Sequence, residues 1–167
     1  MTLTTITNGA FIKAGLIILF FIFLDLASKH LVVTYLDDTL KIIPGILSLE
    51  KVQNPGIALG MFARAGAVIP YLIPVGIGIV IYFFWNTPPG KSWEFHGYAF
   101  ILGGAVGNYV DRLLTGTVTD FIRLDFLGRL FPYIFNVADI IICVGVGLII
   151  LQLILDIRRK TDAPGSS

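Results

Sequence analysis

The chain reads VTDFIRLDFLGRLFPYIFNVADIIICVGVGLIILQLIL at residues 118–155. The second half of this stretch is a run of about 20 mostly apolar residues, the length that crosses a bilayer as a helix. Asp120 precedes the run, and Asp139 lies in its first turns. Two hydrophobic segments joined by one loop end and begin on the same membrane face. Both carboxylates are therefore expected at one surface.

The composition indicates a membrane protein. The 167 residues are 56% hydrophobic and only 14% charged, and a soluble domain needs a polar surface that this composition does not supply. The net charge of +1 gives no electrostatic basis for binding nucleic acid. The single Cys143 excludes a disulfide within the chain, and His30 and His96 lie in different segments. No metal or other cofactor is expected.

We expect one integral-membrane domain over residues 1–167, acting as a monomer among membrane lipids. The predicted fold class is an all-α membrane protein, with four transmembrane helices and a small extracytoplasmic β-sheet between the first and second helices. An even number of spans puts both termini on one side and the two long loops on the other. The predicted helices cover about residues 14–34, 65–85, 95–114 and 135–157, the loops about 35–64 and 115–134, and a disordered tail about 161–167.

The first long loop carries a strand pattern. Leu47 and Leu49 alternate with polar residues, between the turn signals Pro44-Gly45 and Asn54-Pro55-Gly56, which predicts a small sheet or hairpin. The apolar run at residues 57–62 is suited to lie on the membrane surface. A basic cluster at residues 158–160 favours a cytoplasmic location for both termini. The loops then face the extracytoplasmic side.

Ionisable residues inside spanning segments are costly and need partners, water or a function. Asp25 and Lys29 are four residues apart, so they share a helix face and can pair. A structural ion pair explains them as well as a functional site does, and Lys29 can also extend toward the interface.

The third segment ends in a second polar group. Asn108, Asp111 and Arg112 lie on one helix face, and either a helix end entering the interface or a binding site explains them. The glycines just before them, including Gly104, permit close helix packing.

The fourth segment opens on a capping pattern. Asn136 is suited to the N-cap, and Asp139 to the third helical position, where a carboxylate is favourable. Capping explains one acid but not why Asp120 lies on the same membrane face. Nearly all these polar residues map to one half of the protein, and the opposite half is nearly bare of such groups. That asymmetry favours a site at one interface.

The available chemistry is that of two aspartates. No serine has an obvious histidine or lysine partner, and Cys143 lies in an apolar helix, where burial hides it. Two close carboxylates cannot both ionise easily, so they share a proton. The ionised carboxylate can then take a proton from water while the other donates to a carbonyl oxygen. This pattern predicts peptide hydrolysis without a covalent intermediate.

Five motifs together resemble the lipoprotein signal peptidase family, also called signal peptidase II. They occur in the family's order and cover most of the chain. They are Asp25-Leu-Ala-Ser-Lys29, Asn54-Pro-Gly56, Gly103-Gly-Ala-Val-Gly-Asn-Tyr-Val-Asp-Arg112, Val118-Thr-Asp-Phe121 and Phe135-Asn-Val-Ala-Asp139.

The resemblance implies an aspartyl endopeptidase of the bacterial cytoplasmic (inner) membrane, with cytoplasmic termini and an extracytoplasmic active site. Its substrate would be a prolipoprotein, cleaved just before a cysteine that already carries diacylglycerol. Asp120 and Asp139 match the catalytic dyad, and Asp25 and Lys29 match a pair that supports the fold and the site. The other positions expected to bind substrate or support the site are Asn54, Gly56, Gly104, Asn108, Asp111, Arg112, Asn136 and Ala138.

Two other functions are compatible with the polar residues alone. A small transporter or proton-conducting subunit would use them to line a pathway, but such a path needs ionisable groups on both halves of the bilayer. A lipid-binding assembly factor would have no chemistry, and replacing Asp120 or Asp139 by asparagine would leave its function intact.

Overall fold

The computed structural model describes residues 8–56, 68–88, 90–130 and 132–162. These residues form helices interrupted by two groups of short strands. The elements in chain order are α1 (Asn8–Tyr35), β1 (Leu40–Ile43), β2 (Leu47–Asn54), α2 (Ile69–Trp85), α3 (Ser92–Thr115), β3 (Val118–Leu124), the 3-10 helix η2 (Asp125–Leu130), β4 (Ile134–Phe135) and α4 (Val137–Asp162).

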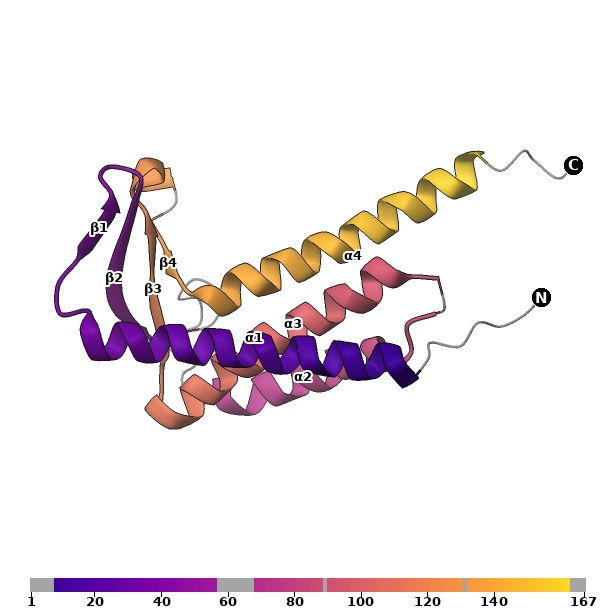
Figure 1. Cartoon of the computed structure of the whole chain (residues 1–167), viewed down its shortest axis with the longest axis horizontal. Coiled ribbons are helices and arrows are strands. Elements are labelled where there is room, and N and C mark those ends of the chain that lie inside the picture. Colours follow the sequence, from indigo (N-terminus) through magenta and orange to yellow (C-terminus); the bar gives the residue numbers. More distant parts are fainter. Residues whose placement is uncertain (1–7, 57–67, 89, 131, 163–167) are drawn as a thin grey trace, which may run out of the picture.

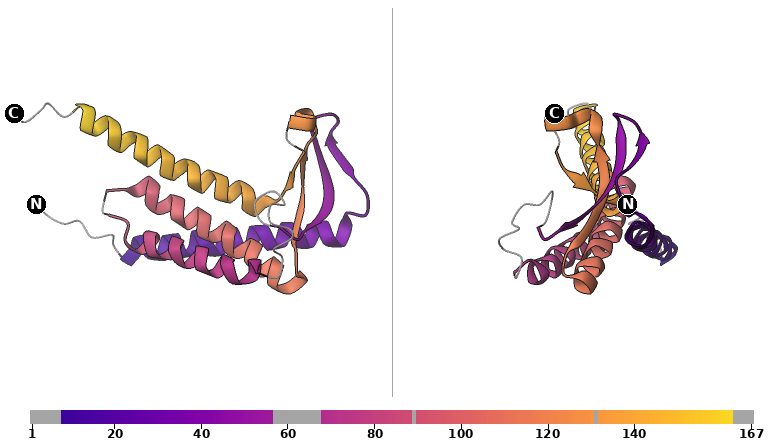
Figure 2. Two further views of the ribbon diagram at one scale, coloured as in Figure 1. Left: turned by 180° about the vertical axis from the view of Figure 1, so that it is seen from behind. Right: turned by 90° about the vertical axis from the view of Figure 1, so that its left-hand side faces the viewer.

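The four helices run lengthwise, and the sheet stands across one end of them (Figure 1). α1 and α3 end at the sheet, and α2 and α4 begin there, so the start of α1 and the end of α4 are both at the opposite end of the molecule. α3 packs against α1, α2 and α4, and α4 leans away from α1 and α2 toward its C-terminal end, as the rear view also shows (Figure 2). The predicted alternation of helix directions is therefore present.

Several boundaries differ from those expected. α1 begins at Asn8 rather than near residue 14, and α4 extends to Asp162, so the first residues of the expected disordered tail are helical. α4 starts at Val137 because Phe135 pairs with Ile122 in the sheet and Asn136 caps the helix. Residues 57–67, which include the apolar run predicted to lie on the membrane and the expected start of the second helix, fall outside the described residues.

The sheet is larger than predicted. Its four strands are antiparallel in the order β1-β2-β3-β4. The predicted hairpin of the first loop is present, with Leu40 opposite Leu49. The second loop adds β3 and β4, with Asn54 opposite Val118. The sheet thus joins both long loops, and this pairing places β3 between β2 and the start of α4.

Among the described residues, length and hydropathy identify two helices able to cross a membrane, Gly9–Tyr35 and Val137–Thr161. The apolar helix Pro70–Trp85 is shorter, and α3 carries Asp111 and Arg112. The described residues thus form a mostly helical protein with a small antiparallel sheet. Four membrane-spanning helices stay a prediction.

The end of the helices opposite the sheet is less bare than the sequence suggested. Lys91 Nζ lies 3.4 Å from Glu94 Oε2 and 3.5 Å from Asp156 Oδ2. Gln152 is buried and donates to Asp156 Oδ1 at 2.9 Å. These contacts tie the ends of α3 and α4 together, which gives the polar groups a structural reason to be there.

Glycines allow α3 and α4 to pack closely. A Cβ built on Gly145 would lie 2.7 Å from the carbonyl oxygen of Gly97 and 2.8 Å from Ile101 Cγ1. Gly147, two residues along the same helix, has open space at its Cβ position. The pair gives a matched test of this contact.

We expect Gly145→Ala to lower the free energy of unfolding by about 1–3 kcal/mol, because an added methyl group in a packed interface forces the helices apart. Gly147→Ala should leave it unchanged or raise it by up to about 1 kcal/mol through helix propensity. Thermal unfolding of both variants in detergent measures the difference. Equal stability of the two variants would show that this contact does not hold α3 against α4.

Candidate active site

Asp120 and Asp139 come from different elements and meet where the sheet joins the helices. Each is the third residue of its element, β3 and α4. The side-chain amide of Asn136 lies between them: its Nδ2 donates to Asp120 Oδ1 at 2.6 Å, and its Oδ1 accepts the backbone N–H of Asp139 at 3.0 Å. One buried amide therefore links both carboxylate residues at the same end of the protein.

Asn136 and Asp139 form the predicted cap at the start of α4. The Asn136 side chain accepts the Asp139 N–H, and the Asn136 backbone N–H donates back to Asp139 Oδ2 at 3.1 Å. This reciprocal arrangement satisfies two backbone donors at the helix start. It also fixes the position of the Asp139 carboxylate relative to Asn136.

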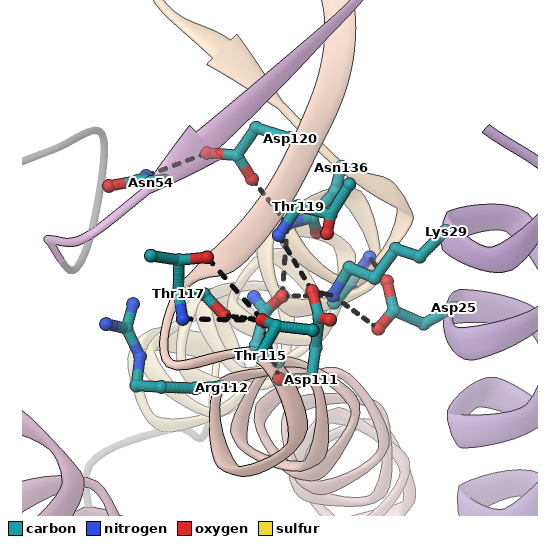
Figure 3. Close-up of polar contacts among 12 residues, drawn as sticks. Asp25, Lys29, Asn54, Asp111, Arg112, Thr115, Thr117, Thr119, Asp120 and Asn136 are labelled. Atoms are coloured by element: carbon teal, nitrogen blue, oxygen red, sulfur yellow. Dashed lines mark hydrogen bonds and ion pairs between the residues drawn. The ribbon is translucent and has the colours of Figure 1, made fainter. Parts of the chain in front are cut away.

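Asp120 is 3% exposed and accepts two amide hydrogen bonds. Asn54 Nδ2 donates to its Oδ2 at 2.7 Å (Figure 3), and Asn136 donates to its Oδ1. Burial raises the pKa of Asp120 to about 6; the nearby charge of Asp139 adds to this, and the two amides and Lys29 oppose it. Asp120 therefore keeps a proton at a pH where an ordinary aspartate has lost it.

The predicted pair Asp25 and Lys29 is present, with Lys29 Nζ 2.7 Å from Asp25 Oδ2. Lys29 is buried, so the alternative in which it extends to the interface is wrong. Its ammonium group also donates to Asn108 Oδ1 at 2.6 Å, and Asn108 Nδ2 donates to Asp139 Oδ1 at 3.0 Å. Asn108 thus connects α1 to Asp139.

Arg112 holds the turn that follows β2. Its guanidinium donates to the carbonyl oxygen of Pro55 at 3.0 Å and to that of Gly56, and the Gly56 N–H donates to Asn54 Oδ1 at 2.9 Å. Among the described residues its hydrogen bonds go to the loop that carries Asn54, so it orders a hydrogen-bond donor of Asp120.

Gly104 and Ala138 let α3 and α4 approach beneath the carboxylates. A Cβ on Gly104 would lie 2.6 Å from the carbonyl oxygen of Ala138, and Ala138 itself is completely buried. Asp111 is also buried and lies 3.6 Å from Lys29. The structure therefore brings all twelve predicted site residues to one end of the molecule.

A cavity of about 960 Å³ opens beside the two aspartates, between α2, α3, α4 and the sheet. Its wall is largely apolar, and the polar groups converge at the sheet end. Sequence reasoning missed the apolar lining. Helical spacing from Asn108 and Asp139 would have found part of it, since Ala105 and Cys143 lie three and four residues away. The lining includes Ile73, Ala105, Tyr109, Leu124, Leu127, Phe135, Ile140, Cys143 and Val144.

Cys143 differs from the expectation that it is hidden. It is exposed and lines the cavity one helical turn from Asp139, because that face of α4 turns toward the cavity rather than toward α3. Among the described residues, no group of three or more His, Cys, Asp or Glu side chains is arranged to hold a metal ion.

Comparison with known proteins decides the family. A family model described as signal peptidase (SPase) II matches residues 17–155. The chain belongs to the signal peptidase II family. A protein of Enterococcus faecalis named lipoprotein signal peptidase is 40% identical to it over 142 residues, covering 83% of this chain and 86% of the relative. The lipoprotein signal peptidase of Lactobacillus gasseri is 40% identical over 134 residues, covering 78% and 84%.

Solved structures of bacterial membrane enzymes share this fold. A bacterial membrane enzyme determined by the in meso method at 2.3 Å resolution superposes with a TM-score of 0.79 and 29% identity, covering 93% of each chain. The apolar helices and these relatives together make this signal peptidase a transmembrane protein. Membership of the family also makes it a peptidase.

Proposed function

We propose that this protein removes the signal peptide from prolipoproteins whose cysteine already carries diacylglycerol, cutting just before that cysteine. The observation that carries the proposal is the pair of aspartates, bridged by Asn136, at the head of an apolar cavity. Family relatives named lipoprotein signal peptidase support the substrate class. The aspartate pair supports acid–base hydrolysis as the mechanism.

The cavity suits a lipid-modified substrate. Ile140 and Val144 line it and are exposed, so the cavity is open along α4. Acyl chains anchored in the bilayer hold the modified cysteine near the headgroup plane. Asp139, the third residue of α4, lies about 5 Å into the helix at about 1.5 Å rise per residue. The reacting bond and the carboxylates are then at similar depth.

The two carboxylates take different roles. Asp120, whose pKa is raised to about 6 by burial, holds the shared proton and donates it to the scissile carbonyl oxygen. Asp139 is the base: its carboxylate accepts hydrogen bonds from Asn108 and from the backbone of Asn136, which hold it in place. It removes a proton from the attacking water.

A basic cluster at the end of α4 supports the proposed orientation. Arg158, Arg159 and Lys160 end α4, and basic residues flanking a span favour the cytoplasmic side. The sheet, both aspartates and the mouth of the cavity then face the extracytoplasmic side of the inner membrane, with α1 to α4 as four spans. The protein is proposed to act as a monomer.

The test is cleavage of a matched pair of precursors in detergent, followed by gel shift. We expect the wild-type protein to cleave a diacylglyceryl-modified prolipoprotein, and to cleave the unmodified precursor at least about 100-fold more slowly, since misplacement of the bond by about 1 Å costs that much. Equal cleavage of both precursors would show that the enzyme does not require the diacylglyceryl group on its substrate. No cleavage of either by folded protein would contradict the proposed function.

A further inference from the structure

Asp25, on α1, reaches the start of α4. Its Oδ1 accepts the backbone N–H of Ala138 at 3.0 Å, and Ala138 directly precedes Asp139. The first N–H groups of a helix have no partner within that helix, so Asp25 supplies one from another element. The position of Asp139 therefore depends on a carboxylate carried by α1.

Asp111, on α3, makes the corresponding contact with β3, the strand that carries Asp120. Its Oδ2 accepts the backbone N–H of Thr119 at 2.7 Å (Figure 3), and Thr119 directly precedes Asp120. Asp25 and Asp111 thus each bind the peptide N–H just before one of the two proposed catalytic residues.

Lys29 joins these two carboxylates. Its Nζ lies 2.7 Å from Asp25 Oδ2 and 3.6 Å from Asp111 Oδ2, and it donates to Asn108 Oδ1 at 2.6 Å. Asp25, Lys29 and Asp111 are 0%, 3% and 6% exposed. We refer to these three residues as the Lys29 hub.

A purely structural role accounts poorly for the Lys29 hub. Burying ions is costly, and neutral residues of similar volume often stabilise a protein as well or better. The charged hub instead fixes the relative positions of four elements, because it connects α1, α3, the start of α4 and β3 to one ammonium group.

We infer that Lys29 is a positioning residue, which acts through Asp25 and Asp111 to set the separation of Asp139 and Asp120. This inference rests on the proposed function, because the separation matters for two carboxylates that share one proton. Through Asn108, Lys29 also orients the amide that donates to Asp139.

The decisive variant is the neutral triple substitution Asp25→Asn/Lys29→Met/Asp111→Asn. It removes every charge of the hub, keeps an acceptor oxygen near each backbone N–H, and preserves volume. We expect its Tm to stay near that of the wild type. We expect kcat for the lipidated precursor to fall about 100-fold, the cost of a displacement of about 1 Å, with KM changed less than about threefold.

Two further variants complete the experiment. Asp111→Asn removes only one ion pair, and we expect it to fold normally and to lower kcat about tenfold, a smaller displacement. Lys51→Met changes an exposed lysine near the same end of α1 and should leave kcat and Tm unchanged.

A wild-type kcat in the triple variant or in Asp111→Asn would overturn the inference. So would a loss of kcat no larger than the fraction of protein that is unfolded. The proposed function would still stand in that case, provided the wild-type control cleaves the lipidated precursor. A wild-type control that fails to cleave would overturn the proposed function, and the inference with it.

Discussion

Asp120→Asn and Asp139→Asn are each expected to lower the rate of precursor cleavage by about 10³-fold or more, the scale of lost acid–base catalysis. Asparagine has nearly the same shape as aspartate, so both variants should insert and fold. The measurement is initial rate on the lipidated precursor, with circular dichroism and size exclusion to establish the fold. Because the carboxylates act as one unit, the double variant should lose little more than either single variant.

The control for this loss is Asp38→Asn, which changes an exposed aspartate at the same end of the protein and should leave turnover unchanged. Near-normal turnover in either Asp120→Asn or Asp139→Asn would contradict the dyad. The protein would then still be a peptidase, but one whose chemistry depends on other groups.

The pH dependence of the free energy of unfolding gives an independent test of Asp120. Its pKa is about 6 in the folded protein and 3.8 as the ordinary value, so the folded state binds the proton more tightly than the unfolded state. The folded protein thus loses stability as the pH rises through this window. Relative to the wild type, Asp120→Asn should gain about 1–3 kcal/mol between pH 4 and pH 7. A constant difference across that range would show that Asp120 does not titrate in this way.

The sequence was sufficient wherever the signal is local. The i,i+4 pair of Asp25 and Lys29 and the cap formed by Asn136 and Asp139 are both present in the structure, because each depends only on helix geometry. Counting apolar segments was enough to predict that Asp120 and Asp139 lie at the same end of the protein.

The sequence was insufficient where packing decides the structure. Residues 118–121 of β3 are buried on both faces of the strand. Its apolar and polar residues therefore do not alternate as they do in a half-exposed strand. Its pairing with β2 brings together residues 66 positions apart, such as Asn54 and Asp120. The contact of Lys29 with Asp111 has the same origin, since no short-range pattern indicates which helices pack.

Asn136→Asp is the second change for which we expect a large effect, and it replaces a single NH₂ group by oxygen. Asn136 is completely buried, and its Nδ2 donates to Asp120 Oδ1 and, at 3.0 Å, to Asn108 Oδ1. An aspartate at this position keeps the acceptor for the Asp139 N–H, so the cap of α4 survives. The new carboxylate, however, turns its oxygen toward two acceptors and adds a third acid beside Asp120 and Asp139.

We expect Asn136→Asp to lower kcat at pH 7.5 by about 10²-fold or more, within the range of lost acid–base function. Neighbouring carboxylates cannot all ionise, so the added acid takes up a proton as the pH falls and again offers a donor to Asp120. The deficit relative to the wild type should therefore be smaller at pH 5 than at pH 8. Asn86→Asp, at an exposed helix end far from the sheet, is the matched control. A deficit in Asn136→Asp that is the same at every pH, or that follows loss of fold, would show that the amide serves only the cap.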